Sequence, residues 1–308
     1  MGYYLGIDGG GTKTLFCLAD ERGTVLSTWK TIGISYRQYS MDEVCQRLQE
    51  GTRQCLAAAG RKEAALSAVC IGYPGYGESK PQDGELERRV RTQFAPVPVI
   101  LVNDVEIAWA GALNGAPGIH VVCGTGSIAY GGNQSGKRAR CGGWLDFFSD
   151  EGSGYWLGRK AMQIFSQQAD GREKKGPLYE ILRKQLKLCE DGAFIDCMAK
   201  EFIPWRDRVA SLQMPLLTAA REGDETAKRA YAQAVKELVR LVKALKDRLC
   251  LPDGCSVTYS GSLFLAEDLI LTPFRTAVAA IGGKVTPPEK DPVEGAVQIA
   301  RKTTEGKI

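Results

Sequence analysis

Residues 3–20 read YYLGIDGGGTKTLFCLAD, a stretch in which three consecutive glycines follow an aspartate and precede Thr-Lys-Thr. Apolar residues alternate after the glycines, a pattern that is typical of a short β-strand rather than of an amphipathic helix. A polar turn and a further strand-like run, TVLSTW, follow directly. The sequence therefore predicts a β-hairpin whose tight turn holds the glycines, with backbone N–H groups that can face an anion without side-chain obstruction.

Two common phosphate-binding motifs do not fit this spacing. A P-loop needs Gly, four residues, then Gly-Lys-Ser/Thr. Counted from Gly6, the second glycine is Gly11, but Thr12 stands where the lysine is required. A dinucleotide fingerprint starting at Gly9 and Gly11 would need a third glycine where Thr14 stands. The turn is thus predicted to bind phosphate in another way, and a purely structural hairpin turn is the alternative.

The composition is that of a soluble globular protein, with 308 residues, 44% hydrophobic and 25% charged residues, and a net charge of +4. This length suits two domains. The charge is too mild and too evenly spread to indicate nucleic-acid binding. No signal peptide is recognisable, and no apolar run approaches the ~20 residues that span a bilayer. Ten scattered cysteines without a C-x-x-C pair predict reduced thiols and a cytoplasmic location.

Few residues are available for histidine or cysteine chemistry. The single histidine, His120, lies in the strand-like run GIHVVCG and is predicted to be a buried core residue. Acid–base chemistry is therefore expected to fall to a carboxylate. Cys141, beside Gly142, is the one cysteine for which the sequence leaves reactivity open.

The first part of the chain alternates strands and helices. A helix is predicted from Ser40 to Gly60, where Ser40 and Glu43 form a capping box and Gly60 supplies the stop. The elements that follow are a strand over 66–72, a helix around 84–94, a strand over 97–104 and a helix over 105–113. This alternation predicts a layered α/β domain with a parallel sheet.

The pattern restarts at residues 118–132, GIHVVCGTGSIAYGG, with a strand, a glycine-rich turn and a second strand. A helical middle third follows, and then a strand that leads into the Gly-Ser turn SGSLF at 260–264. We predict an N-terminal domain over 1–115 and a C-terminal domain over 116–290 with a helical insertion. For the closing helix at 291–308, packing back on the first domain is one expectation.

Asp104 lies where a predicted strand ends and a helix begins. Aspartate often fills such a position as a helix cap. A cap and a catalytic base are compatible roles, because both leave a carboxylate at the end of the strand.

Four segments together resemble a known family: GIDGGGTKT at 6–14, ND at 103–104, CGTGS at 123–127 and CGGWLDFFSDEGSGYWLG at 141–158. The chain is similar to the N-acetylglucosamine kinase and BadF/BadG/BcrA/BcrD ATPase branch of the actin, hexokinase and heat-shock-chaperone ATPase superfamily. The resemblance covers nearly the whole chain, and its last segment is the most specific. It implies a duplicated ribonuclease-H-like α/β fold, two domains flanking a nucleotide cleft, and a homodimer.

The resemblance also implies an activity and its residues. It implies an ATP-dependent kinase for an amino sugar, N-acetylglucosamine or a relative such as N-acetylmuramic acid or glucosamine, acting at the 6-hydroxyl. Asp104 would be the base, and Asp8 would hold Mg²⁺ through water. ATP contacts are implied for Gly9, Gly10, Gly11, Thr12, Lys13, Thr14, Gly124, Thr125, Gly126, Gly261 and Ser262. Sugar contacts are implied for Ser127, Gly143, Asp150 and Asn103.

One loop departs from the family pattern. In GISYRQY at 33–39, Arg37 stands where the family has an asparagine that holds the N-acetyl group, and Tyr39 stands where it has a tryptophan. Pro74 likewise replaces an expected serine. If Arg37 faces the sugar, its guanidinium would repel a free amine and favour a carboxylate. The alternative is that Arg37 points into solvent.

Two other functions compete with the kinase, and the sequence favours neither. The family includes ATPases that activate a dehydratase or reductase partner and carry an iron–sulfur cluster between subunits, for which paired cysteines are needed beside the second phosphate motif. Cys123 and Cys141 flank a long hairpin and lack the expected glycine-rich context. A non-enzymatic ATP-binding regulator is not supported either, because the chain has no helix-turn-helix extension and no basic patch. The sequence thus favours the kinase.

Overall fold

The structure is a computed structural model that describes residues 2–62 and 66–304. The chain divides into two compact units. Unit 1 comprises the residues up to Pro117, residues 131–137 and the residues from Pro287 on. Unit 2 comprises residues 118–130 and 138–286.

The sheet of unit 1 has the strand order β3-β2-β1-β4-β5. Its strands are β1 (Tyr3–Gly9), β2 (Lys13–Asp20), β3 (Val25–Ile32), β4 (Leu66–Tyr73) and β5 (Val99–Asn103). β1 and β2 pair antiparallel, with Gly9 opposite Thr14, which confirms the predicted hairpin. β3 pairs antiparallel with β2, while β1, β4 and β5 are parallel. The sheet is therefore mixed: the strands joined by short turns are antiparallel, and the strands joined through helices are parallel, as the βαβ alternation predicts.

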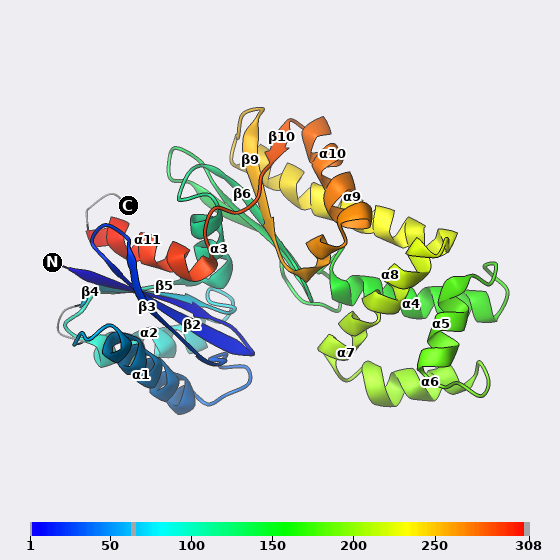
Figure 1. Cartoon of the computed structure of the whole chain (residues 1–308), viewed down its shortest axis with the longest axis horizontal. Coiled ribbons are helices and arrows are strands. Elements are labelled where there is room, and N and C mark those ends of the chain that lie inside the picture. The colour runs from blue at the N-terminus through cyan, green and yellow to red at the C-terminus, as the bar shows by residue number, and fades with distance from the viewer. Residues whose placement is uncertain (1, 63–65, 305–308) are drawn as a thin grey trace. The chain divides into compact units, whose positions relative to one another are not determined.

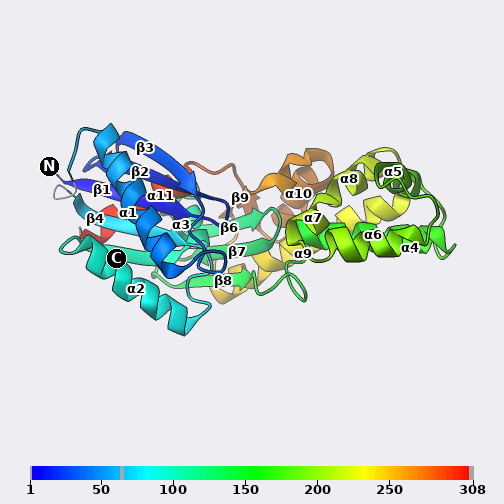
Figure 2. The same cartoon turned by 90° about the horizontal axis from the view of Figure 1, so that it is seen from below.

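Helices cover both faces of this sheet. Figures 1 and 2 show α1 (Met41–Ala58) and α2 (Lys80–Phe94) on one face and α3 (Asp104–Ala112) and α11 (Pro292–Thr304) on the other. The capping box of α1 is present as predicted. α2 begins earlier than predicted, because a proline fits its first turn.

α11 returns from the end of the chain to lie against β1 and α3. The backbones approach closely at two glycines. A Cβ on Gly295 would lie 2.0 Å from the carbonyl oxygen of Ile107, and one on Gly6 would lie 2.4 Å from that of Val293. Because no side chain larger than hydrogen fits at either place, both glycines are needed for this packing.

The sheet of unit 2 has the order β10-β9-β6-β7-β8. Its strands are β6 (Gly118–Cys123), β7 (Ser127–Gly132), β8 (Arg138–Gly142), β9 (Cys255–Ser260) and β10 (Gly283–Val285). β6, β9 and β10 run parallel. When its strands are counted from β6, this sheet has the same order as the first, which confirms the predicted duplication of the fold.

The rest of unit 2 is helical. Long helices pack on its sheet or on one another, and α9 contacts β6 and β8 (Figure 1). The helices are α4 (Gly154–Ala169), α5 (Pro177–Gln185), α6 (Ala193–Cys197), α7 (Arg206–Ser211), α8 (Gln213–Arg221), α9 (Glu225–Arg248) and α10 (Thr272–Ala280). A 3₁₀-helix at Ser262–Leu265 and π-helical turns at Met198–Phe202 and Glu267–Leu271 complete it. Within the described ranges, no helix is both long and apolar enough to cross a membrane.

Candidate active site

The first glycine-rich segment forms the turn between β1 and β2 in unit 1. Its backbone is packed so closely that side chains would not fit. A Cβ on Gly10 would lie 2.8 Å from the carbonyl oxygen of Lys13, and one on Gly33 would lie 2.0 Å from that of Gly11. The Gly10 carbonyl also accepts a hydrogen bond of 3.0 Å from the Ile34 amide. The turn is thus a well-supported surface on which backbone amides can approach a phosphate.

The two threonines of this segment differ in exposure. Thr12 is exposed on the turn, as is Lys13, whereas Thr14 is fully buried. Thr14 shares its face of β2 with Phe16, which is also fully buried. The Thr14 hydroxyl has no hydrogen-bond partner among the described residues. Gly9, opposite Thr14, has no room for a Cβ, which would lie 2.7 Å from the Ile34 side chain. The side chains that reach the surface here are therefore those of Thr12 and Lys13.

Two carboxylates lie at the ends of parallel strands, β1 and β5, which flank β4 in the sheet. Asp8 is near the end of β1, and Asp104 directly follows β5. Burial raises the pKa of Asp8 to about 6, against the opposing charge of Lys13 and with a smaller contribution from Asp291. Burial and the charge of Asp8 raise the pKa of Asp104 to about 7. Buried carboxyl groups whose pKa values are raised in this way at the ends of strands are typical of a functional site.

The helix cap at this position is Asn103, and Asp104 is the first residue of α3, so Asp104 does not fill the alternative role of a cap. The Asn103 side-chain oxygen accepts a hydrogen bond of 3.1 Å from the Val105 amide. Its side-chain nitrogen donates to the Tyr76 carbonyl at 2.8 Å. Because both ends of the Asn103 amide have protein partners, it fixes the end of β5 against the loop that follows β4. Asp104 accepts one bond of 2.9 Å, from the Val105 amide.

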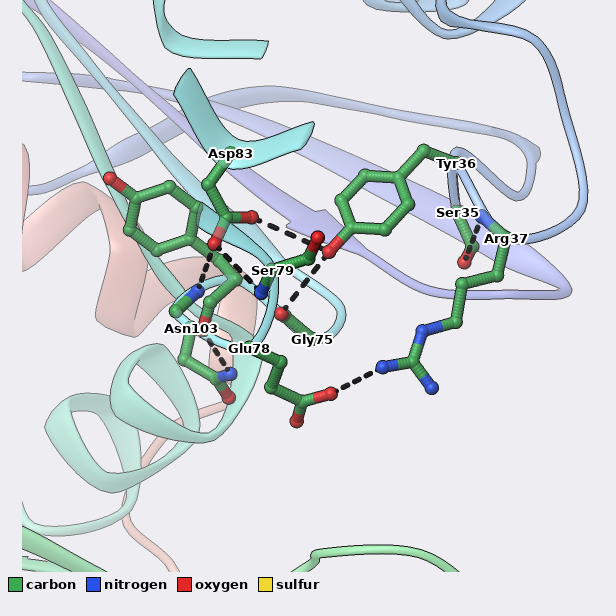
Figure 3. Close-up of polar contacts among 10 residues, drawn as sticks. Ser35, Tyr36, Arg37, Gly75, Glu78, Ser79, Asp83 and Asn103 are labelled. Carbon is green, nitrogen blue, oxygen red and sulfur yellow. Dashed lines mark hydrogen bonds and ion pairs between the residues drawn. The ribbon is translucent and has the colours of Figure 1, made fainter. Parts of the chain in front are cut away.

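The loop that departs from the family pattern also lies in unit 1. The Arg37 guanidinium forms a 2.5 Å ion pair with Glu78 rather than pointing freely into solvent (Figure 3). Tyr39 packs instead beneath Arg47, whose guanidinium carbon lies 3.7 Å from the ring centroid. Sequence reasoning missed Glu78, because nothing local links positions so far apart in the chain.

In unit 2, the second glycine-rich turn connects β6 to β7 and is held by the start of α4. The Gly124 carbonyl accepts from the Gly154 amide at 2.8 Å, and the Thr125 carbonyl accepts from the Tyr155 amide at 3.0 Å. A hydrogen bond of 2.9 Å from the Gly124 amide to the Gly126 carbonyl closes the turn. These bonds use amides at a helix start that would otherwise lack partners, and they fix the shape of the turn.

A polar pocket of about 210 Å³ lies beside this turn. It brings Gly124 and Thr125 together with Ser262, which belongs to the predicted Gly-Ser turn. Gly261 has a φ of +104°, and a Cβ there would lie 2.1 Å from the Cys123 carbonyl oxygen, so only glycine allows this approach. The pocket is completed by side chains that the sequence did not single out. They include Asp207, Ser211 and Gln213.

Asp150 is a buried residue with an unusual backbone, at a φ of +59°. Its carboxylate pairs with Arg206 at 2.5 Å and accepts from the Ser127 amide at 3.4 Å. The Ser127 hydroxyl donates to the Glu151 carbonyl at 2.8 Å. Burial raises the pKa of Asp150 above its ordinary value, and the Arg206 cation opposes that rise. Asp150 and Arg206 therefore brace the second turn, and Arg206 is a further residue that sequence reasoning missed.

Gly143 is the third residue of the most family-specific segment, residues 141–158. Its φ is +65°, and a Cβ there would lie 2.6 Å from the Ile128 side chain. The aromatic side chains just after it, Trp144, Phe147 and Phe148, are exposed. Gly143 thus turns the chain away from β7 and leaves these rings at the surface of unit 2.

The residues present fit the nucleotide and metal that the resemblance implies. Glycine cradles whose Cβ positions are filled by neighbouring backbone suit a phosphate chain. Asp8, with its raised pKa, is a carboxyl that a nearby cation would restore to its charged form. Among the described residues, no group of three or more His, Cys, Asp or Glu side chains forms a metal cage. Mg²⁺ commonly needs only one or two carboxylates together with substrate phosphates and water, so Asp8 is compatible with it.

Most of the cysteines are buried or half-buried. All ten are free, and Cys17, Cys55, Cys70, Cys123 and Cys255 are buried. The Cys123 thiol faces the Gly152 carbonyl oxygen at 3.5 Å, and burial strongly raises its pKa. Burial also raises the pKa of Cys141, which disfavours the thiolate form. Cys141 is therefore not an activated cysteine.

His120 is buried as predicted, with its ring nitrogens each 2.9 Å from the hydroxyls of Thr258 and Ser260. Burial lowers its pKa from about 6.5 to about 4. Between these values the unfolded chain binds a proton that the folded chain does not. The contribution of His120 should therefore lower the free energy of unfolding by about 3 kcal/mol as the pH falls from 6.5 to 4.

Urea denaturation of wild type and His120→Gln at several pH values tests this expectation. The raised pKa values of Asp8 and Asp104 increase the free energy of unfolding as the pH falls, which is the opposite effect. Because both proteins contain these two residues, the difference between the proteins reports on the histidine. The difference in unfolding free energy should shrink or reverse as the pH falls through this window. A difference that stays constant from pH 7 to pH 4 would contradict a buried neutral His120.

Known proteins resemble the chain over almost its full length. Residues 5–300 match the BadF/BadG/BcrA/BcrD ATPase family. The chain is 33% identical over 304 residues to an N-acetylmuramic acid/N-acetylglucosamine kinase of Clostridium acetobutylicum, which covers 98% of this chain and 99% of that protein. It is 25% identical over 256 residues to an N-acetyl-D-glucosamine kinase of Dictyostelium discoideum, which covers 80% of each protein.

The fold has a similar counterpart among crystal structures. A candidate N-acetylglucosamine kinase from Chromobacterium violaceum aligns with a TM-score of 0.76 and 28% sequence identity. The alignment covers 96% of this chain and 98% of that one. The resemblance drawn from the four sequence segments is therefore confirmed by the whole sequence and by the fold.

Proposed function

Because the chain belongs to the BadF/BadG/BcrA/BcrD ATPase family, we propose that it is an ATP-dependent kinase that phosphorylates an amino sugar. The acceptor we propose is N-acetylglucosamine or a relative such as N-acetylmuramic acid, with the 6-hydroxyl as the reacting group. The observation that carries the proposal is Asp104, a carboxyl at the end of β5 that is coupled to Asp8 and has a pKa raised to about 7.

Asp104 is the proposed base toward the sugar hydroxyl. A base works best when its pKa lies near the working pH, and burial gives Asp104 that property. Its carboxylate accepts a hydrogen bond from the Val105 amide and keeps acceptor capacity for a hydroxyl. Asn103 positions Asp104 by capping α3 and by bonding to the Tyr76 carbonyl.

We propose that the glycine turn of unit 1 binds phosphates of ATP, with Thr12 and Lys13 as its exposed side chains. In unit 2 we propose Gly124–Gly126 as a second phosphate contact, and the pocket that includes Ser262 as the place for the adenosine. Ser127, Asp150 and Arg206 would act by holding the second turn in shape. Phosphoryl transfer depends on alignment and charge neutralisation, which rigid backbone turns of this kind support.

Asp8 is the proposed residue for Mg²⁺, through water. When bound, the ion would neutralise charge on the transferred phosphoryl group. Asp8 is placed for this by β1, whose end carries it next to the glycine turn. Burial disfavours the ionised form of Asp8, and a bound cation would stabilise that form and lower the pKa again.

The alternative, an ATPase that activates a dehydratase or reductase partner, is not favoured. An iron–sulfur cluster needs accessible thiolates. Cys123, the cysteine next to the second turn, is fully buried and its pKa is strongly raised.

The ten free thiols support a cytoplasmic location. The family resemblance supports a homodimer, and light scattering on the purified protein would test this.

An ATP-consumption screen tests the proposed function directly. N-acetylglucosamine, N-acetylmuramic acid, glucosamine and glucose would each be offered with ATP and Mg²⁺, with a sugar-free reaction as the control. We expect sugar-dependent release of ADP and a phosphorylated N-acetylated sugar in the mass spectrum. ATP hydrolysis that no sugar stimulates, together with iron in anaerobically purified protein, would instead support the activator.

Gly10→Val should weaken ATP binding by about tenfold or more, because the new side chain has no room beside the Lys13 carbonyl and distorts the turn that must meet phosphate. Titration calorimetry with ATP and Mg²⁺ measures this. Gly84→Val is the matched control, because nothing lies within 4 Å of a Cβ at that exposed position of α2. ATP affinity that is the same in Gly10→Val as in wild type would rule out the turn as a phosphate site.

A further inference from the structure

Two loops of unit 1 meet next to the carboxyl ends of β4 and β5 (Figure 3). One loop contains Tyr36 and Arg37, and the other runs from the end of β4 to α2. The Tyr73 hydroxyl joins them, because it accepts from the Tyr36 amide at 2.8 Å and donates to the Ile34 carbonyl at 2.6 Å. The rings of Tyr36 and Tyr73 also stack, with centroids 5.4 Å apart. The two loops are thus held against each other by polar and aromatic contacts.

Asp83, a buried residue in the first turn of α2, fixes the second loop. Its carboxylate accepts from the amides of Gly77 at 2.9 Å and Ser79 at 3.3 Å, and from the Tyr36 hydroxyl at 3.4 Å (Figure 3). Gly77 has a φ of +90°, a backbone conformation that favours glycine. Asp83 thereby holds both loops in one geometry, and that geometry determines where the side chains between them can lie.

The Arg37–Glu78 ion pair bridges the two loops at this place. The Arg37 side chain is 52% exposed and that of Glu78 is 21% exposed, so a solute can reach the guanidinium. Gly75 keeps the space beside the pair open, because a Cβ there would lie 3.2 Å from the Glu78 carboxylate. Glu78 is also close enough to Asp104 for its charge to add to the rise in the pKa of Asp104, after burial and Asp8. The pair therefore lies near the proposed base, where an acceptor sugar would bind.

We propose that the Arg37–Glu78 pair selects the acceptor sugar by charge, with Arg37 binding a carboxylate on an acidic amino sugar and Glu78 opposing it. This inference rests on the proposed function. An acidic substituent, such as the carboxylate of N-acetylmuramic acid, can form a charge-assisted bond to the exposed side of the guanidinium. Glu78 holds the same guanidinium and repels the incoming carboxylate. The two residues thus set the preference between acidic and neutral sugars in opposite directions.

The same geometry changes the expectation drawn from Arg37 alone. An unpaired guanidinium would repel the ammonium group of glucosamine. With Glu78 at 2.5 Å the positive charge is largely balanced, so this repulsion is weaker than the sequence predicts. Selectivity against glucosamine should then be modest, and selectivity for an acidic sugar should increase when Glu78 is neutralised.

A double-mutant cycle tests the inference with purified full-length protein. The measured quantity is kcat/KM for N-acetylmuramic acid divided by kcat/KM for N-acetylglucosamine. Arg37→Ala should lower this ratio by about tenfold, through loss of a charge-assisted bond and exposure of Glu78. Glu78→Gln should raise it by about threefold, the scale of an exposed charge pair. The double variant should return toward the wild-type ratio, and the changes should appear mainly in KM for the acidic sugar.

A matched control lies in the same unit. Arg53 and Glu50 form a 2.7 Å pair on the exposed surface of α1, and Arg53→Ala and Glu50→Gln should leave the ratio unchanged. If N-acetylmuramic acid is not turned over, its inhibition constant against N-acetylglucosamine replaces kcat/KM in the ratio. One outcome would overturn this inference alone: the wild type phosphorylates N-acetylglucosamine, but Arg37→Ala and Glu78→Gln do not shift the kcat/KM ratio in opposite directions. Wild type that phosphorylates no amino sugar would overturn the proposed function, and this inference with it.

Discussion

Asp104→Asn is expected to lower kcat for N-acetylglucosamine by about two to four orders of magnitude while ATP still binds. Asparagine has nearly the same shape as aspartate but cannot take up a proton from the sugar hydroxyl. Asn103 and the Val105 amide should keep the start of α3 in place, so the loss should reflect chemistry rather than folding. The loss should appear in kcat, because the carboxylate is needed most in the transition state.

The pH profile provides a second measurement. The base must be ionised, so wild-type kcat/KM should rise with pH through a pKa of about 7. This limb should be missing from the residual activity of Asp104→Asn. ATP affinity is checked by calorimetry, and Asp42→Asn, a change at an exposed carboxylate on α1, is the control. Turnover near the wild-type value in Asp104→Asn would sink the assignment of the base.

Asp8→Asn is expected to reduce kcat/KM by about 10–100-fold and to raise the Mg²⁺ concentration needed for half-maximal activity. The magnitude is typical for residues that hold a metal through an intervening group. A Mg²⁺ titration at saturating ATP measures it. Because the charge of Asp8 raises the pKa of Asp104, the pH limb of the variant should also move to lower pH. An unchanged Mg²⁺ requirement would contradict the role of Asp8.

Features that depend on local spacing could be predicted from the sequence. The glycine turn between β1 and β2 follows from strand alternation around three glycines. The capping box of α1 follows from Ser40 and Glu43, which are close in the chain. The duplication was visible because each half places a glycine-rich turn after an apolar strand.

The partners of the candidate site residues could not be predicted in the same way. Arg206 meets Asp150, and Glu78 meets Arg37, only because the tertiary fold brings distant segments together. No periodicity or motif encodes such a pair. The cap of α3 shows a related difficulty at short range, since Asn and Asp are equally good caps and only the backbone decides that Asn103 fills the position.

The return of α11 to the first sheet has a consequence for the order in which the protein is made. Unit 1 contains residues up to Pro117 and again from Pro287 on, so all the chain of unit 2 leaves the ribosome before unit 1 is complete. Until α11 emerges, the backbone at Gly6 on β1 and at Gly111 on α3 lacks the helix that covers it. Unit 1 is therefore begun before unit 2, yet it can be completed only after all of unit 2 has been synthesised.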